Sequence, residues 1–192
     1  RDISDERRHE RERDITVALL RLFNEGNNVH QLIRGVLEAL HEWTECEAIG
    51  IRLRDGEDYP YFETRGFGAD FVEKERFLCE RDPHGQIVRD SLGNPILECM
   101  CGNILCGRFD PSLPFFSAEG SFWSNCTSEL LATTTEAERQ ARTRNRCNGE
   151  GYESVALVPL RSGGVTFGLI QLNDKRIGRF TPERIALFER LA

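Results

Sequence analysis

The residues best suited to chemistry in this sequence are its cysteines. Three of the seven cysteines lie within eight residues, in the stretch ECMCGNILCG at positions 98–107. If residues 98–101 are extended, side chains two positions apart share a face, so Cys99 and Cys101 would point to one place. The Gly-Asn pair that follows can turn the chain and return Cys106 to the same place. The spacing therefore predicts a cluster of thiols.

Such a cluster suits a soft metal. Tetrahedral zinc and iron-sulfur clusters are both held by four ligands, so a fourth sulfur must come from elsewhere in the chain. Zinc would stabilise the surrounding segment, whereas an iron-sulfur cluster would sense oxygen or redox state. The Cys-x-Cys-x4-Cys spacing indicates metal less strongly than two Cys-x-x-Cys pairs would. A thiol redox switch without metal, and buried cysteines with no role, stay open as alternatives.

Two further groups of residues are candidates for binding a small molecule. One is an aromatic group that could wall an apolar pocket or form a small core of its own: Phe115, Phe116, Phe122 and Trp123. The other is a polar helix at 136–146, predicted by a capping box from Thr135 to Glu138. Its arginines, Arg144 among them, either face solvent or bind an anion.

The elements that must position these residues follow from periodicity and turn signals. Helical spacing of apolar residues predicts helices at 15–25 and 29–40 and another from Thr181, and turn-flanked strands predict hairpins at 49–67 and 153–174. Periodicity fails in an insert at about 78–129, which is rich in cysteine and aromatic residues. This order predicts an α+β domain, with a central antiparallel sheet and helices packed on one face.

Composition narrows the class of protein. The 192 residues are 39% hydrophobic and 30% charged, as expected of one globular domain with a helical extension. A formal net charge of -7 opposes binding to nucleic acid. We find no apolar run long enough for a membrane and no secretory signal, so we expect a cytoplasmic location and reduced thiols. The chain begins without Met, which indicates a piece of a longer protein.

The closing segment, GYESVALVPLRSGGVTFGLIQLND and then FTPERIALFERLA, resembles a GAF domain. The shared features are a Gly-Tyr-x-Ser strand, a Pro-Leu before the turn, a Gly-x-Leu strand and a final helix. The resemblance covers residues 15–192 and implies a GAF-like sheet with an insert at about 78–129. Residues 1–14, RDISDERRHERERD, are similar to the end of a PAS domain that enters a signalling helix. Together they imply a bacterial multidomain signalling protein with a histidine kinase or a cyclic-dinucleotide enzyme downstream.

The resemblance also implies a function. Such a domain would be a non-catalytic regulatory sensor that binds a small molecule, a metal centre or both, and relays the change to its output domain. In the GAF fold the Gly-Tyr strand borders the ligand cavity, which makes Tyr152 a candidate for ligand contact. The same placement makes Cys147 the first choice for the fourth sulfur, with Cys126 as the alternative. Some GAF sensors hold haem, so haem on His84 or a cysteine is a weaker alternative to zinc or iron-sulfur.

Relay through terminal helices predicts a parallel homodimer, formed by the stripe Ile15, Leu19 and Leu22 on the first helix. Two other functions compete with this one. One branch of the GAF fold reduces free methionine sulfoxide with cysteines, and three close thiols could support that chemistry. A dimerisation spacer that binds no ligand is the second competitor.

Overall fold

A five-stranded antiparallel sheet forms the centre of the molecule in the computed structural model, which describes residues 3–25 and 28–192. Its strands are β1 (Ala48–Leu53), β2 (Tyr61–Arg65), β3 (Phe122–Ser124), β4 (Ser154–Ser162) and β5 (Val165–Asp174), in the spatial order β2-β1-β5-β4-β3. The central β4–β5 hairpin turns at Gly163 and Gly164, both of which have positive φ, a conformation that glycine adopts without a steric cost. The predicted α+β fold with a central antiparallel sheet is therefore confirmed.

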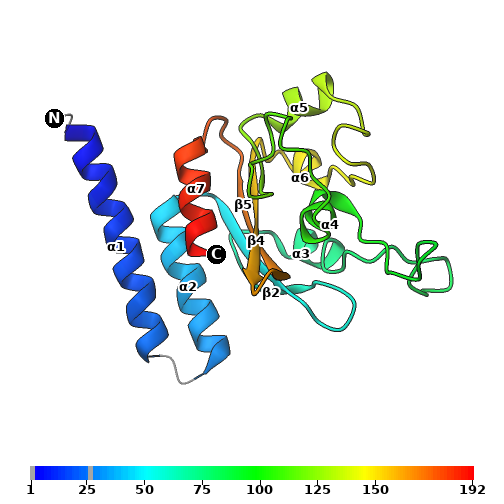
Figure 1. The fold of residues 1–192 in the computed structure, drawn as a ribbon, viewed down its shortest axis with the longest axis horizontal. Helices are drawn as coiled ribbons and strands as arrows, with labels where there is room; N and C mark the ends of the chain where they lie inside the picture. Colours follow the sequence, from blue (N-terminus) through cyan, green and yellow to red (C-terminus); the bar gives the residue numbers. More distant parts are fainter. Residues whose placement is uncertain (1–2, 26–27) are drawn as a thin grey trace.

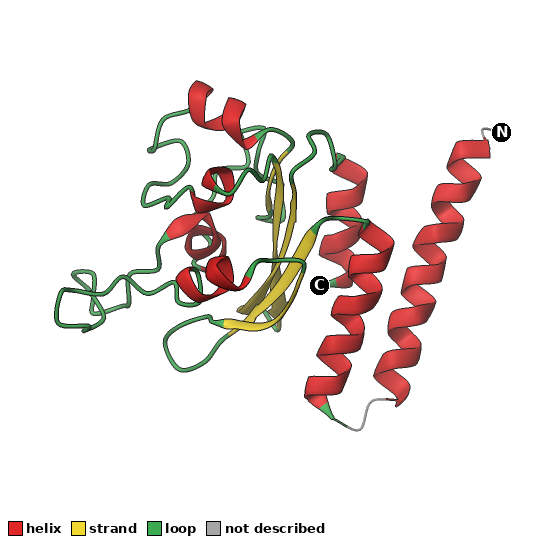
Figure 2. Ribbon diagram, turned by 180° about the vertical axis from the view of Figure 1, so that it is seen from behind, coloured by secondary structure: helices red, strands yellow, loops and turns green. Residues whose placement is uncertain are grey.

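The long helices lie together on one face of the sheet (Figures 1 and 2). They are α1 (Ile3–Glu25), α2 (Val29–Thr44) and α7 (Pro182–Leu191). Asn28 caps α2, because its side chain accepts a hydrogen bond from the amide of His30. Thr181 caps α7 in the same way, with Pro182 at the first helical position. The apolar faces of these helices and of the sheet form one of the two hydrophobic cores.

Short elements and loops cover the opposite face. The helices there are α3 (Ala69–Lys74), α4 (Cys99–Leu105), α5 (Thr127–Thr133) and α6 (Arg146–Gly149). They pack on the second hydrophobic core, to which α4 contributes the largest number of buried side chains. Because side chains alternate along a strand, β4 serves both cores. Val155 and Leu157 face the short elements, whereas Ala156 and Val158 face the long helices.

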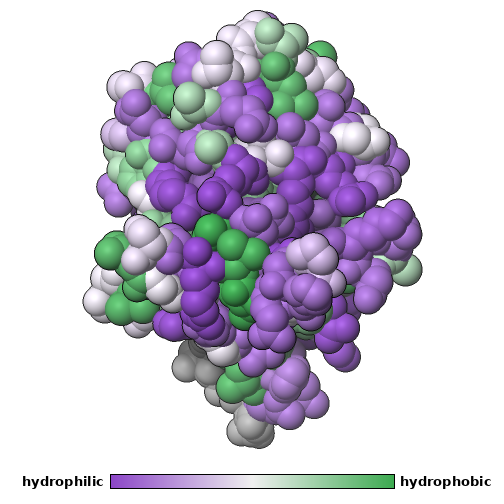
Figure 3. Space-filling model, turned by 90° about the vertical axis from the view of Figure 1, so that its right-hand side faces the viewer, coloured by the Kyte–Doolittle hydropathy of each residue, from purple (hydrophilic) through white to green (hydrophobic). Residues whose placement is uncertain are grey.

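Residues 79–97 form an arm that projects from the body of the molecule (Figure 1). The arm contains an eight-residue repeat, RDPHGQIV followed by RDSLGNPI, which the sequence analysis missed. In each copy the aspartate, Asp82 or Asp90, accepts hydrogen bonds from the main-chain amides two and four residues later. These Asx turns stabilise a segment that has only isolated β-bridges and no continuous strand pairing. The face that presents the arm is mostly hydrophilic (Figure 3).

Two local predictions were wrong. The capping box at Thr135 and Glu138 does form, with both main-chain amides bonded to the opposite side chain, but no helix follows it at 136–145, and α6 begins only at Arg146. Residues 140–142 instead adopt left-handed φ angles. The stretch 98–101 is not extended, because α4 begins at Cys99. No helix among the described residues is long and apolar enough to cross a membrane.

Candidate functional site: a thiol-lined cavity

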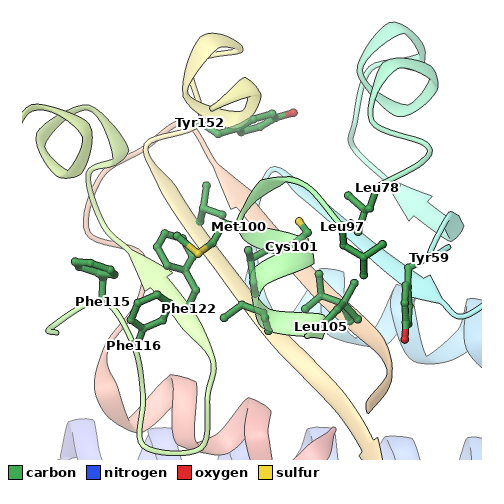
Figure 4. Packing of buried hydrophobic residues seen from close by; sticks show 14 of the residues in the cluster. Tyr59, Leu78, Leu97, Met100, Cys101, Leu105, Phe115, Phe116, Phe122 and Tyr152 are labelled. Carbon is green, nitrogen blue, oxygen red and sulfur yellow. The ribbon is translucent and has the colours of Figure 1, made fainter. Parts of the chain in front are cut away.

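A small cavity of about 60 Å³ lies between α4, α5, α6 and the sheet. We call it the thiol cavity, since Cys99, Cys101 and Cys147 line it, together with Met100, Phe122, Thr127, Leu130, Leu131, Arg139, Thr143, Asn145, Arg146, Asn148, Val155 and Leu157. Its walls are mainly apolar. In Figure 4, Met100 of α4 lies beside Phe122. The volume is below the roughly 300–1,000 Å³ usual for ligand pockets, so the conformation is closed or the ligand is small.

Helix α4 brings two of the thiols together at its first turn. Cys99 has a φ of 66°, which is unusual for a residue with a side chain. Interaction with the Cys101 side chain lowers the pKa of Cys99 to about 6, although burial and the charge of Glu75 act in the opposite direction. Interaction with the Cys99 side chain, and then burial, raise the pKa of Cys101 well above its usual value.

The third thiol belongs to α6 and meets the other two through Gln171 of β5. The Gln171 amide nitrogen donates to the Cys147 sulfur at 3.5 Å, and its oxygen lies 3.7 Å from the Cys101 sulfur as acceptor. The same oxygen accepts from the Tyr61 hydroxyl at 2.8 Å. Burial raises the pKa of Cys147 to about 12. A polar network on the sheet therefore holds Cys101 and Cys147 around one side chain.

A buried cation completes the electrostatics of the site. Arg52 of β1 is fully buried, and its guanidinium carbon lies 3.6 Å from the centroid of the Tyr61 ring. The guanidinium donates to the main-chain oxygens of Tyr59, Glu75 and Arg76, at 3.0, 2.6 and 3.2 Å, while its Nε atom has no partner among the described residues. These acceptors carry no formal charge. The positive charge of Arg52 is therefore available to the nearby sulfurs, which it attracts.

The segment 139–145 covers the cavity in a strained conformation. Gln140, Ala141 and Arg142 are three consecutive left-handed residues, with φ of 64°, 61° and 56°. Side chains at such angles cost about 1–2 kcal/mol each, so something must hold the segment in place. Asn103 does so by donating to the main-chain oxygens of Arg139 and Ala141, at 2.9 and 3.1 Å. We call residues 139–145 the cover.

The cover carries two buried polar atoms without partners among the described residues, and both belong to residues that line the cavity. They are Nε of Arg139 and Oγ1 of Thr143. Buried polar groups almost always have a hydrogen-bond partner, so each unpaired one calls for an explanation. A bound molecule with a hydrogen-bond acceptor would satisfy both.

The predicted four-sulfur set is only partly assembled. Cys106 is exposed at the C-terminal end of α4, one helix length from Cys99. Cys126 lies at the start of α5 and contacts Glu153 at 3.6 Å. No group of three or more Cys, His, Asp or Glu side chains within residues 3–25 and 28–192 is arranged to hold a metal ion. The donor set therefore does not fit a tetrahedral four-thiolate centre, because α4 separates sulfurs that an extended strand would have joined.

Most of the residues predicted to contact a ligand also lie outside the thiol cavity. Of the six residues proposed, only Phe122 lines the thiol cavity. Phe115 and Phe116 pack against Phe122 as part of the core, and Tyr152 lies apart from all three (Figure 4). Two further predicted contacts face elsewhere. Trp123 packs against the core on the long-helix side of the sheet, and Arg144 pairs with Glu98 at 2.8 Å.

Sequence reasoning named Arg139 among the arginines that could bind an anion, but it missed the other residues that give the site its polarity: Arg52, Asn103, Thr143, Gln171 and Asn173. One signal was available. Gln171 and Asn173 interrupt an otherwise apolar strand, two positions apart, which places both side chains on one face. Arg52 sits at the same kind of position in β1.

Comparison with known proteins identifies the fold family. The family model of the GAF domain matches residues 28–192, and no curated protein matches the chain. A putative GAF sensor protein from Burkholderia vietnamiensis superposes with a TM-score of 0.61 at 12% identity, over 95% of this chain and 89% of that one. The free methionine-R-sulfoxide reductase of Staphylococcus aureus, in complex with its substrate, gives 0.60 at 10% identity, over 94% and 90%.

A third solved structure comes from a signalling protein. The domain of a putative two-component sensor histidine kinase from Sinorhizobium meliloti 1021 gives a TM-score of 0.53 at 13% identity, over 86% of each chain. At these identities the structural likeness speaks for the fold alone. The family model covers most of the chain, and the chain therefore belongs to the GAF domain family.

Proposed function

We propose that this chain is a regulatory sensor domain, which binds a small molecule in the thiol cavity and passes the change to its terminal helices. One observation carries the proposal. A strained cover lines one side of the cavity, and two polar atoms of that cover, on Arg139 and Thr143, are buried without a partner among the described residues. Strained backbone and unpaired polar atoms are typical of ligand sites, where the ligand offsets their cost.

The lining indicates the chemistry of the ligand. Leu130, Leu131 and Val155 offer an apolar surface to one part of the molecule. The Nε of Arg139 offers a hydrogen-bond donor, as the Thr143 hydroxyl can, to an acceptor group on another part. A guanidinium favours a carboxylate. The ligand expected here is therefore a short carboxylic acid with an apolar chain.

A route from the cavity to the long helices runs through β4. Leu157 lines the cavity, and Val158, the next residue, packs in the core shared with α1, α2 and α7. A ligand that shifts β4 therefore changes both faces of the sheet, because packed cores respond by discrete rearrangement. A downstream output domain, such as a histidine kinase, would read the positions of these helices.

The ligand proposal is tested by thermal unfolding in the presence of straight-chain carboxylates of two to six carbons. A binding member should raise the melting temperature of the full chain in a concentration-dependent way. Thr143→Val should weaken this response, and Leu131→Trp, which fills the cavity, should abolish it. Ser128→Ala, outside the cavity lining, is the matched control and should respond as the natural chain does. If no carboxylate stabilises the natural chain at millimolar concentration, the proposed ligand class is wrong.

The predicted homodimer needs a different surface from the one first expected. Ile15 and Leu19 are buried against the rest of the chain, so they are not free to contact a second copy. Val17 and Leu20 of α1 are 41% and 57% exposed. We propose that these two residues face the partner copy. Leu20→Glu should then convert a dimer to a monomer in sedimentation velocity, and a natural chain that sediments only as a monomer would contradict the proposal.

A thiol reductase is the second candidate, since the cavity brings Cys99, Cys101 and Cys147 together. A turnover assay with free methionine sulfoxide and a dithiol reductant separates it from a sensor. Turnover that Cys99→Ser abolishes would establish the reductase. Zinc or iron-sulfur binding and the attached PAS domain stay predictions, and metal analysis of the purified chain tests the first.

A further inference from the structure

A loop of the insert, residues 117–121, lies between the thiol cavity and the last helix of the chain, and we call it the edge loop. The residues that border it, Phe116 and Phe122, pair with each other as an isolated antiparallel β-bridge. Phe122 begins β3, the strand at one edge of the sheet, and it also lines the cavity. Both ends of the edge loop are therefore attached to a pair of residues that includes part of the cavity wall.

The rings beside the edge loop are packed so closely that Phe122 cannot move alone. The centroid of its ring lies 6.2 and 6.1 Å from those of Phe115 and Phe116, and all three rings are buried (Figure 4). Such a dense core transmits the displacement of one ring to its neighbours. The cavity, at about 60 Å³, is smaller than most ligands, so a bound molecule has to displace the lining. A displacement of Phe122 then reaches Phe116, the residue directly before the edge loop.

The edge loop is a closed turn. The Ser117 amide donates to the main-chain oxygen of Ser121 at 2.8 Å, and the Ser121 amide donates to the Ser117 hydroxyl at 2.9 Å. The Gly120 amide donates to the main-chain oxygen of Ser117 at 3.1 Å. Gly120 has a φ of 85°, and a Cβ there would lie 2.6 Å from the Phe109 ring, so this side of the turn is packed as well. A turn closed in this way carries a displacement of its ends to Ser117.

The Ser117 hydroxyl also contacts α7. It donates a hydrogen bond to the carboxylate of Glu189, in the last turn of that helix. Hydrogen bonds to a charged group are stronger than those between neutral groups. A hollow of about 470 Å³, lined by Glu119 of the edge loop and by residues of β4 and α7, lies beside this bond, so side-chain packing does not fill the space there. Because β3 is an edge strand, this connection passes around the sheet and not through it.

We propose that the edge loop couples the thiol cavity to α7, through a Ser117–Glu189 hydrogen bond that is made when the cavity is closed and weakened when the cavity is filled. This inference rests on the proposed function, since it names the contact by which a filled cavity would act on a terminal helix. It is separate from the route through β4. Ser117 and Glu189 are positioning residues in this scheme, and the bond between them is the element with two states. Linkage makes the coupling reciprocal, so a change at Glu189 also alters binding in the cavity.

The test requires no ligand, because Leu131→Trp fills the cavity from α5. Hydrogen exchange of the main-chain amides at 186–190 in α7 is measured on the full chain by mass spectrometry. We expect Leu131→Trp to accelerate this exchange on the order of tenfold, since it weakens a hydrogen bond to a carboxylate. Ser117→Ala alone should give a similar acceleration, and Leu131→Trp should add nothing to it. Phe122→Leu, which changes the same cavity wall, repeats the comparison should Leu131→Trp fail to fold.

Two controls separate coupling from a bond that is merely structural. Ser112→Ala removes an exposed hydroxyl of the same insert, which donates to the Asp110 carboxylate at 2.7 Å. It should leave the exchange of α7 and its response to Leu131→Trp unchanged. Glu189→Gln keeps an acceptor oxygen for Ser117 and should preserve the response to cavity filling, whereas Glu189→Ala should abolish it.

Two results would overturn the proposal. One is an equal response of α7 to cavity filling in the natural chain and in Ser117→Ala, which would leave the route through β4. The other is a natural chain in which neither Leu131→Trp nor Phe122→Leu changes the exchange of α7. Failure of every carboxylate to raise the melting temperature refutes the proposed ligand class instead, and it does not affect this comparison, because no ligand is present in it.

Discussion

Replacing Asn103 by leucine tests how the cover of the thiol cavity is held. The Asn103 side chain is fully buried and takes part in three hydrogen bonds. Its nitrogen donates to the main-chain oxygens of Arg139 and Ala141, and its oxygen accepts from Nε of Arg108 at 2.9 Å. Leucine has a similar volume and can make none of them. The two cover oxygens would then be buried without a partner unless the cover moves toward water.

The expected magnitude follows from these bonds and from the strain at 140–142. Three left-handed residues store roughly 3–6 kcal/mol, taken at about 1–2 kcal/mol each. The two bonds from Asn103 to the cover offset about 2 kcal/mol of this, at about 1 kcal/mol each. Their loss should lower the free energy of local opening by the same amount. The open population of the cover would then rise by a factor on the order of 30.

Hydrogen exchange of the cover amides measures this change directly. The amides of Arg139, Gln140 and Ala141 are hydrogen-bonded to main-chain oxygens of residues 135–137, so they exchange only when the cover opens. In Asn103→Leu they should exchange on the order of 30 times faster. Asn94→Leu, an exposed asparagine in the arm, is the control and should leave them unchanged. Exchange within a factor of two of the natural chain in Asn103→Leu would refute the reasoning.

Two further predictions concern stability. Gly66 has a φ of 78°, and a Cβ there would lie 1.9 Å from the main-chain oxygen of Glu47, so Gly66→Ala should prevent folding or lower the urea midpoint sharply. Gly56→Ala, with a φ of 59° and open space around it, should cost only about 1 kcal/mol. Burial raises the pKa of Asp174, but hydrogen bonds from Arg176 outweigh it, so the net pKa is lowered. The folded state therefore gains stability that is complete above the unfolded pKa of about 3.9 and is lost as the pH falls through the lower folded value. Asp174→Asn should remove about 2–3 kcal/mol at pH 7 in urea titrations, and the difference should shrink below about pH 4; a difference that does not change with pH would contradict this assignment.

Short sequence patterns were sufficient to predict much of the fold. The β4–β5 hairpin has two mainly apolar strands around a Gly-Gly turn, and α7 begins after Thr181, with Pro182 at its first position. Such signals act over a few residues, and no distant contact opposes them here. The cover shows the opposite case. Its capping box forms as predicted, but Asn103 and the buried Arg139 hold the following residues away from a helix.

The sequence indicated three cysteines of the candidate site but neither their geometry nor most of the polar residues around them. Cys99, Cys101 and Cys147 were chosen as neighbours, and all three line the cavity. Their arrangement was wrong because the stretch was taken as extended. An extended stretch followed by a turn at Gly102 and Asn103 would have brought Cys106 back to them, whereas the helix carries it to the far end of α4. Short apolar stretches do not distinguish helix from strand, because both bury the same residue types.

The sequence by itself determined the class of fold, the antiparallel hairpins and the presence of several cysteines in a short stretch, since these depend on residue type and on spacing over a few positions. Only the tertiary structure decided which thiols meet. Residues far apart in the chain surround the three cavity cysteines: Gln171 of β5 contacts Cys101 and Cys147, and Arg142 of the cover accepts a hydrogen bond from the Cys99 amide. Such contacts arise when the sheet closes, and no local pattern encodes them.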